Sequence, residues 1–187
     1  MKIGLITLLL SMQIISFSQS IEVLDVKYGF KTIKLDDPLS KFSNQISLIK
    51  TFSEDNTSVY KFTPSDMNLY SVFNSKMDEI RLIFENSSNK LIGILLLKTY
   101  PPSNSNHYSD ALDEASTLRE NFIAMFGKGN SKISNNDASG DQLGIAWIGD
   151  KAALSVVTTY HGLSKGSDNQ VAVFKTDYMK AKLNSGF

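Results

Sequence analysis

Apolar and polar residues follow three different patterns in the first part of the chain. Between residues 21 and 35 they alternate in patches, which predicts one or two short strands interrupted at Gly29. The run Asp36-Asp37-Pro38 is typical of a helix start, because aspartate caps helices and proline fits the first helical position. Apolar residues then recur at i, i+3 and i+7, so the sequence predicts a short amphipathic helix over 38–47.

From 48 to 100 the pattern becomes that of strands. Runs rich in β-branched and aromatic residues predict strands at 48–52 and 59–62, and a further short one at 69–73. The runs 80–84 and 91–100 flank Asn86-Ser87-Ser88-Asn89, whose residues are typical of turns. We therefore predict a β-hairpin through this turn.

The second half of the chain begins with the strongest helical pattern. One apolar stripe extends over 109–126, acidic residues fill the first turns, and Gly127 is a natural helix stop. The polar stretch 128–141 predicts a surface loop. Strands at 143–148 and 152–160 flank Gly149-Asp150, a pair that favours a tight hairpin. A last strand at 171–174 and a short helical tail near 178–183 complete the pattern.

This order of elements predicts the α+β class. Strands that follow one another through short links pair antiparallel, so we expect a mostly antiparallel sheet with two main helices, 38–47 and 109–126, packed on one face. Each predicted helix is followed by strands that end in a similar sequence, at 95–100 and at 156–160. This internal echo is compatible with duplication of a helix-plus-sheet unit.

Residues 1–18 have the pattern of a cleaved signal peptide. Lys2 supplies a positive charge, an apolar run extends from Ile3 to Ile15, and Ser16-Phe17-Ser18 places small residues at the cleavage site. The run is shorter than the about 20 apolar residues that span a bilayer. An uncleaved anchor and a buried first helix are the alternatives. We expect export to the periplasm or the exterior, and a single α+β domain over 19–187.

Composition narrows the classes of partner. The chain contains no cysteine, which excludes disulfides and a lipid anchor after the leader. It has 19 basic and 19 acidic residues without a block of either sign, so no footprint for nucleic acid is present. No second apolar run reaches membrane length, and we expect no transmembrane segment after signal cleavage.

Catalytic and metal-binding patterns are weak. The two histidines, His107 and His161, are too few and too far apart in sequence for a zinc site, and no cofactor motif occurs. His161 with Asp168 and either Ser155 or Ser164 could form a hydrolase triad, but no nucleophile-elbow motif supports it. We therefore predict no catalytic, metal-binding or cofactor-binding residue, and keep a hydrolase using His161 as the alternative function.

Aromatic residues are the best candidates for a binding surface. They occur in the segment 60–73 and at the ends of elements, where they can line a protein-binding or glycan-binding face. Packing in the core is the competing explanation for the same residues. The candidates are Tyr60, Phe62, Tyr70, Phe73 and Tyr160.

The layout resembles that of small exported bacterial envelope proteins. The resemblance rests on the opening 28–39, on Phe126-Gly127-Lys128 at the end of the long helix, and on Ala146-Trp147-Ile148. It extends to α+β modules of the BamE and β-lactamase-inhibitor-protein type, and transfers no functional residue. It implies binding rather than catalysis. We expect an exported, non-catalytic binding or envelope-assembly module whose partner is an envelope protein, an extracellular protein or a glycan.

Overall fold

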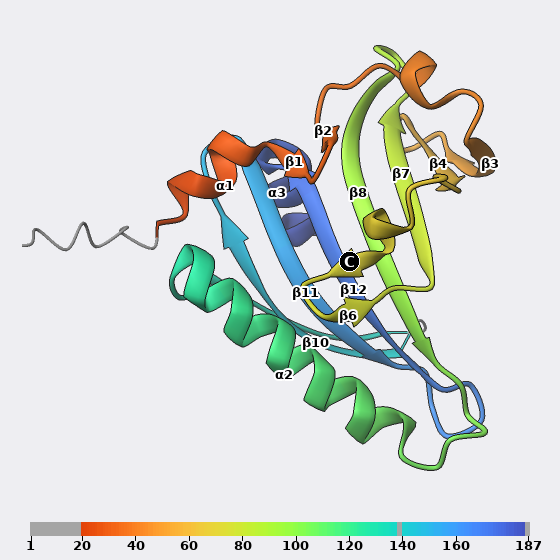
Figure 1. The fold of residues 1–187 in the computed structure, drawn as a ribbon, viewed down its shortest axis with the longest axis vertical. Coiled ribbons are helices and arrows are strands. Elements are labelled where there is room, and N and C mark those ends of the chain that lie inside the picture. Colours follow the sequence, from red (N-terminus) through yellow and green to blue (C-terminus); the bar gives the residue numbers. More distant parts are fainter. Residues whose placement is uncertain (1–19, 138–139, 186–187) are drawn as a thin grey trace, which may run out of the picture.

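The computed structural model describes residues 20–137 and 140–185 (Figure 1). The predicted signal peptide, 1–18, lies outside the described residues. An eight-stranded antiparallel sheet in the order β3-β4-β7-β8-β12-β11-β10-β9 forms the centre of the fold. Its strands are β3 (Ile46–Phe52), β4 (Thr57–Phe62), β7 (Glu79–Glu85), β8 (Lys90–Tyr100), β9 (Ser131–Asp137), β10 (Gly140–Ile148), β11 (Ala152–Tyr160) and β12 (Ser167–Lys175).

The sheet consists of two four-stranded halves that meet where β8 pairs with β12. Within each half, neighbouring strands are joined in sequence order as antiparallel pairs. The β7–β8 hairpin turns through 86–89 and the β10–β11 hairpin through 149–151, as the turn residues predicted. The α+β class and the large antiparallel sheet are therefore confirmed.

Short elements and three α-helices surround the sheet. Two small two-stranded sheets, β1–β2 and β5–β6, lie outside it. The remaining elements are α1 (Glu22–Lys27), β1 (Gly29–Phe30), β2 (Ile33–Lys34), η1 (Leu39–Phe42), η2 (Met67–Tyr70), β5 (Ser71–Val72), β6 (Ser75–Lys76), α2 (His107–Phe126) and α3 (Thr176–Ser185). The long helix α2 and its stop at Gly127 agree with the prediction.

Each face of the sheet carries its own apolar cluster. Alternate residues of a strand point to opposite faces, so Val171 and Val173 join the cluster beneath α1 and α2, while Phe174 joins the other. Met179 of α3 belongs to that second cluster, so α3 covers the opposite face. Figure 1 shows α2 in front of the sheet and α3 behind it.

The predicted helix over 38–47 is wrong. Its apolar stripe forms only the single 3-10 turn η1, and β3 begins at Ile46, which pairs with Phe62 of β4. Phe42 is the one stripe position that is fully buried, and its ring packs edge-on against Phe62 at 5.5 Å. Pairing with the sheet thus outweighs a weak local helical preference. The pair of main helices expected on one face is not observed, since α2 is the only long one among the described residues.

Two further expectations need correction. Residues 22–27 form α1 rather than a strand: Leu24 is buried on the sheet, and the N–H of Tyr28 donates to the carbonyl of Leu24 at 2.9 Å, which closes the helical turn. Within the polar stretch 128–141, β9 pairs along β10 as an edge strand. Ile133 supplies its buried apolar contact, at 5% exposure. An edge strand faces water on several sides, so its composition is that of a loop.

Candidate functional site

An apolar pocket of about 270 Å³ lies between α1 and the C-terminal end of α2. Leu154, Val171 and Val173 of the central strands β11 and β12 form its floor, and Phe122 and Phe126 of α2 are among its walls. The segment Gly29–Lys31 and the β5–β6 hairpin complete the lining. The pocket therefore opens directly onto the apolar cluster beneath α1 and α2, which is the larger of the two and is called the main apolar cluster below.

Asp25 fixes α1 at this position. Its carboxylate accepts hydrogen bonds from the backbone N–H groups of Asp150, Lys151 and Ala152, each at 2.8 Å. Burial by itself raises the pKa of Asp25, but the three hydrogen bonds outweigh it and hold the pKa below its ordinary value of 3.8. A Cβ on Gly149 would lie 2.5 Å from Oδ1 of Asp25, so glycine is required beside the carboxylate.

The chain that leaves α1 is held by a second carboxylate. Tyr28 donates a hydrogen bond to Asp36 at 2.6 Å, and Lys175 of β12 pairs with the same carboxylate at 2.9 Å. Burial opposes ionisation of Asp36, and the contacts with Tyr28 and Lys175 lower its pKa overall. Contacts at both ends of the segment 25–36 therefore hold the pocket wall in place.

Phe73 stands at the rim of the pocket in a strained conformation. It begins the two-residue turn between β5 and β6 with φ of 52°, a region that bulky residues rarely occupy. Its ring packs 4.9 Å from that of Phe122, yet 38% of the residue remains exposed. Strain at such a residue persists only where surrounding contacts stabilise it, and it recurs at ligand sites.

The aromatic residues that the sequence proposed do not share one surface. Tyr60 packs edge-on against Phe84 at 5.6 Å, and Tyr60, Phe62 and Tyr70 all lie in or against the main apolar cluster. Tyr70 donates a weak hydrogen bond to the carbonyl of Phe62 at 3.4 Å. Of the five candidates, Phe73 alone lines the apolar pocket.

Tyr160, the fifth aromatic candidate, lies at the other end of α2. Its ring stacks on His107 at 5.8 Å and packs against Tyr108 at 4.9 Å. His107 is only 2% exposed, and its Nδ1 is hydrogen-bonded to the hydroxyl of Ser167 at 2.9 Å. The contacts of this histidine therefore join the start of α2 to β12.

His161 and Asp168 do come together on the face opposite α2. Nε2 of His161 lies 2.5 Å from Oδ2 of Asp168, in a polar pocket of about 230 Å³ that Arg81 and Gln142 also line. Ser155 does not line this pocket. Six residues of strand, at about 3.3 Å each, separate it from His161 by roughly 20 Å. The structure therefore does not place the Ser155 hydroxyl near the imidazole, as a triad requires.

Ser164, the other proposed nucleophile, lies in the exposed turn between β11 and β12. It is not among the residues that line the His161 pocket. Arg81 in that pocket forms an ion pair with Glu79, so the charge of the guanidinium is compensated within the protein. The arrangement resembles a surface ion-pair network more than a reacting centre.

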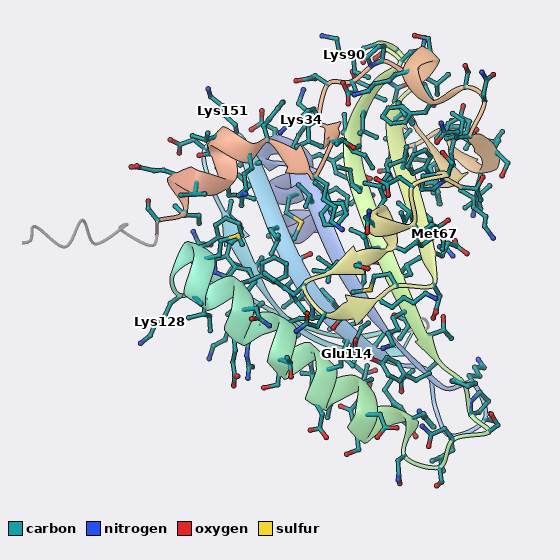
Figure 2. All side chains as sticks on the ribbon, viewed as in Figure 1. Lys34, Met67, Lys90, Glu114, Lys128 and Lys151 are labelled. Carbon is teal, nitrogen blue, oxygen red and sulfur yellow. The ribbon has the colours of Figure 1, made fainter. Side chains whose placement is uncertain are left out.

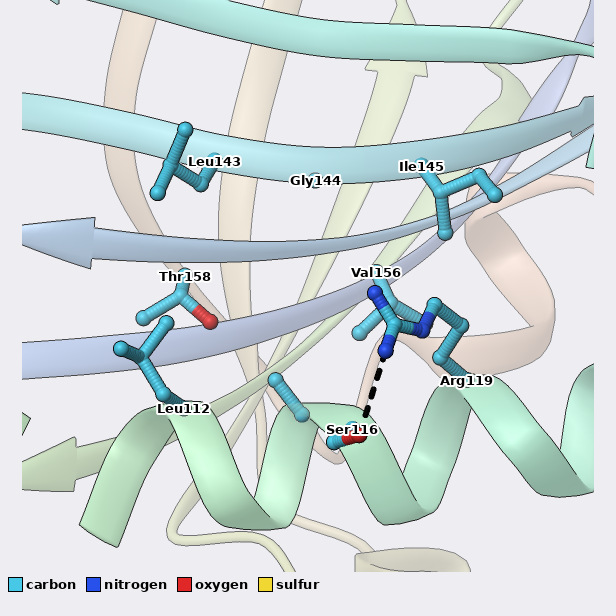
Figure 3. A pocket seen from close by; sticks show the side chains of 9 residues that line it. Leu112, Ser116, Arg119, Leu143, Gly144, Ile145, Val156 and Thr158 are labelled. Carbon is cyan, nitrogen blue, oxygen red and sulfur yellow. Dashed lines mark hydrogen bonds between the residues drawn. The ribbon is translucent and has the colours of Figure 1, made fainter. Parts of the chain in front are cut away.

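A third pocket, of about 290 Å³, lies between α2 and strands β10 and β11 (Figure 3). Leu112, Leu143 and Val156 supply apolar walls, and the Arg119 guanidinium donates to the Ser116 hydroxyl at 3.2 Å. Its lining combines only two structural layers, a helix and the sheet. The pocket beside α1 is enclosed by more elements and has more aromatic walls.

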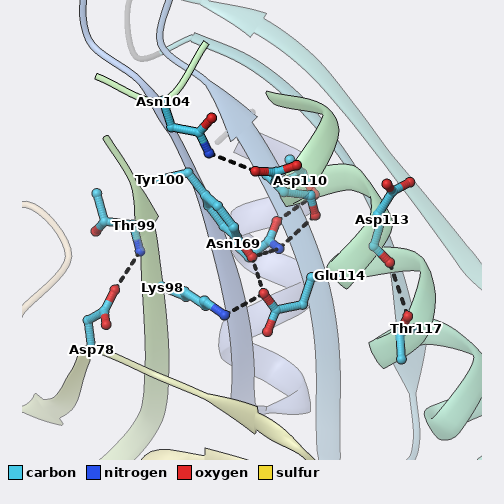
Figure 4. A network of polar contacts seen from close by, with 12 residues as sticks. Asp78, Lys98, Thr99, Tyr100, Asn104, Asp110, Asp113, Glu114, Thr117 and Asn169 are labelled. Atoms are coloured by element: carbon cyan, nitrogen blue, oxygen red, sulfur yellow. Dashed lines mark hydrogen bonds and ion pairs between the residues drawn. The ribbon is translucent and has the colours of Figure 1, made fainter. Parts of the chain in front are cut away.

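A buried polar network joins α2 to the sheet near Glu114 (Figure 4). Lys98 donates to the Glu114 carboxylate at 2.6 Å, Tyr100 donates to the same oxygen, and Asn169 connects Tyr100 to the carbonyl of Ala111. Burial opposes ionisation of Glu114, but Lys98 and Tyr100 lower its pKa overall. No buried side-chain polar atom among the described residues lacks a partner. We therefore interpret the network as structural.

Comparisons with known protein families, curated proteins and solved structures give no match.

Across residues 20–137 and 140–185, no three histidine, aspartate or glutamate side chains gather closely enough to hold a metal ion. No helix in that range has both the length and the apolar character needed to cross a bilayer. The pocket beside α1 thus stands as the best-defined candidate site.

Sequence reasoning found one rim residue of this pocket and missed its walls. Phe122, Met125 and Phe126 belong to the apolar stripe that the sequence shows over 109–126, yet 36% of Met125 remains exposed at the pocket. The adjacent pair Met125-Phe126 makes the apolar stripe wider at this end than a single contact with the sheet requires. This wider stripe is the feature of the sequence that could have indicated an apolar pocket at the end of the helix.

Proposed function

We propose that this protein is an exported binding module that holds a small, largely apolar molecule in the pocket between α1 and α2. The predicted signal peptide supports export to the periplasm or the exterior. The observation that carries the proposal is a pocket of about 270 Å³ lined mainly by aliphatic and aromatic side chains. Ligand sites are typically such clefts, with few polar groups among the apolar walls.

The construction of the rim supports a binding role. A phenylalanine at positive φ destabilises the β5–β6 turn, by about 1–3 kcal/mol, while glycine or asparagine would fit the turn without this strain. The same conformation keeps the ring of Phe73 at the pocket, against Phe122. We interpret this residue as one that contributes to the ligand contact rather than to the hairpin.

A pocket of this kind favours an apolar molecule over a glycan. Sugars require several hydrogen-bonding side chains, whereas Ser71 and two lysines are the only polar side chains that line the pocket among the described residues. An envelope or extracellular protein could present a single apolar side chain here. The enclosure by α1, α2 and the β5–β6 hairpin favours a free small molecule instead.

The test is a titration of the mature protein with the neutral apolar fluorophore N-phenylnaphthylamine. We expect saturable binding at one site per chain. Phe73→Asn relieves the backbone strain and removes the ring, so it should lower the affinity about three- to tenfold without lowering the melting temperature. Phe52→Asn is the matched control, because Phe52 is equally exposed at 38% but lies on β3, where it lines a separate pocket of about 390 Å³ on the opposite side of the sheet from α2.

Two results would contradict the proposal, and a third would contradict the role given to Phe73. The first is non-saturable binding, or none, to the wild-type protein at its native fold. The second is an equal loss of affinity in the Phe73→Asn and Phe52→Asn variants, which would assign the fluorophore to general apolar surface. Retention of full affinity by Phe73→Asn would likewise remove Phe73 from the site.

A further inference from the structure

The rim of the apolar pocket carries positive charge without an acidic partner. Lys27 ends α1 and Lys31 follows β1, and both are exposed residues that line the pocket. None of the described lining residues is acidic. The carboxylate of Asp25, on the same helix, does not line the pocket and lies instead against Asp150, Ala152 and the charge of Lys151.

The contacts of the two lysines leave their charge uncompensated. Lys31 donates to the carbonyl of Asn68 and its Nζ lies 5.2 Å from the centre of the Phe30 ring, and both of these partners are neutral. Neither Lys27 nor Lys31 forms an ion pair among the described residues. Lysine side chains commonly cover apolar surface with the stem and keep the ammonium in water. Two such groups at one rim form a complement to an anion.

Further lysines lie at the same end of the molecule. Lys34 donates to the carbonyl of Lys27 at 2.6 Å, at the end of α1. Figure 2 shows Lys34 and Lys151 beside α1 and Lys128 just after α2. Asp25 and Asp150 lie at this end as well, and Lys151 offsets the charge of Asp25. The charge that faces the pocket is therefore that of the two lining lysines, Lys27 and Lys31.

The volume limits the length of the apolar part of the ligand. At about 30 Å³ for a water-sized group, a cavity of about 270 Å³ holds roughly nine such groups. A long acyl chain would extend out of it. An unbranched chain of about eight to ten carbons would fill it with its charged end at the rim.

We propose that the ligand is a free medium-chain carboxylate, with its chain on Phe122 and Val171 and its carboxylate near Lys27 and Lys31. This inference deepens the proposed function and rests on it. The ligand is a single-chain anion, not a neutral apolar molecule or a membrane surface. The charge of the rim, not the apolar floor, makes that distinction.

Calorimetric titrations of the mature protein with decanoate, decanol and decyltrimethylammonium test the proposal. We expect decanoate to bind about four- to twenty-five-fold more tightly than decanol, at about two- to fivefold for each of the two exposed lysines. The cation should bind more weakly than decanol. The preference for decanoate should shrink as salt rises from about 0.01 M to 1 M, because the rim charges are exposed.

Variants identify the residues responsible. In Lys27→Gln/Lys31→Gln, decanoate and decanol should bind with nearly equal affinity, since the neutral ligand does not use the charges. Lys165→Gln is the matched control, because Lys165 is exposed in the turn between β11 and β12 and does not line the pocket. It should leave the preference unchanged. Single variants give the same test if the double variant does not fold.

The outcomes separate the two proposals. Equal affinity of the wild-type protein for decanoate and decanol overturns the carboxylate assignment but retains the apolar pocket. Failure of all three probes to bind overturns both. Binding to anionic vesicles without binding to monomeric decanoate would identify a membrane surface as the partner and overturn the inference. A preference that survives in the double variant would also contradict it.

Discussion

Asp25 offers the sharpest test of how this fold is held together. Asp25→Asn replaces a carboxylate that accepts three backbone hydrogen bonds with an amide whose NH₂ group cannot accept any. Oδ2 accepts only from Asp150, so that bond is lost, whereas the amide oxygen in place of Oδ1 still accepts from Lys151 and Ala152, but without the carboxylate charge. Allowing about 1 kcal/mol for the lost bond and about 0.5 kcal/mol for each weakened one, we expect a loss of about 2 kcal/mol.

Thermal unfolding followed by circular dichroism measures this effect. For a chain of this length, 2 kcal/mol corresponds to a fall in melting temperature of about 4–8 °C. Glu22→Gln, on the same helix, removes one negative charge from an exposed residue and should change stability by less than about 0.5 kcal/mol. A fall in Asp25→Asn no larger than in this control would refute the account of α1 as a segment held by its carboxylate.

The pH dependence gives a second, independent readout of the same contact. The pKa of Asp25 in the folded protein lies below its ordinary value of 3.8. Its contribution to stability is therefore complete above pH 3.8 and is lost as the pH falls through the folded pKa. The difference in stability between the wild-type protein and Asp25→Asn should be constant near neutral pH and shrink below pH 3.8. A constant difference down to strong acid would contradict the mechanism.

Two further substitutions test the packing of the sheet. Glu114→Gln should lower stability by about 1–3 kcal/mol at neutral pH, because it weakens charge-assisted bonds within a closed network; denaturant unfolding at pH 7 measures the loss. The pKa of Glu114 in the folded protein lies below its ordinary value of 4.5, so this loss should diminish as the pH falls below 4.5. In Gly93→Ala the new Cβ would lie 2.6 Å from two ring atoms of Phe174, so we expect a loss of about 1–3 kcal/mol by the same assay. Adding Phe174→Leu should recover part of it, whereas strictly additive losses would exclude the clash.

Local signals in the sequence were sufficient for several elements. The long helix was predicted because its stripe persists over five turns and Gly127 ends it, and the residue indeed has φ of 79°. The hairpins of β7–β8 and β10–β11 followed from turn residues between apolar runs. In each case the deciding interactions lie within a few residues of one another in the chain.

The secondary structure of the short segments depends on contacts with residues far away in the sequence, which the local pattern does not reveal. Ile46 lies in β3 because Phe62 pairs with it, and the polar run 131–137 becomes a strand because β10 offers a free edge. The face on which α3 packs depends on the alternation of side chains across the complete sheet. Duplication of a helix-plus-sheet unit stays a prediction, although the two halves of the sheet have matching strand order.

The sequence by itself determined the class of the protein, its antiparallel hairpins, its one long helix and the absence of cysteine chemistry, since these depend on composition and on near neighbours. It also named Phe73 as an aromatic worth considering. Only the tertiary structure showed that Phe73, Phe122 and Val171 enclose one pocket with lysines at its rim. Residues separated by about a hundred positions meet there through the pairing of β8 with β12, and no local pattern encodes that meeting.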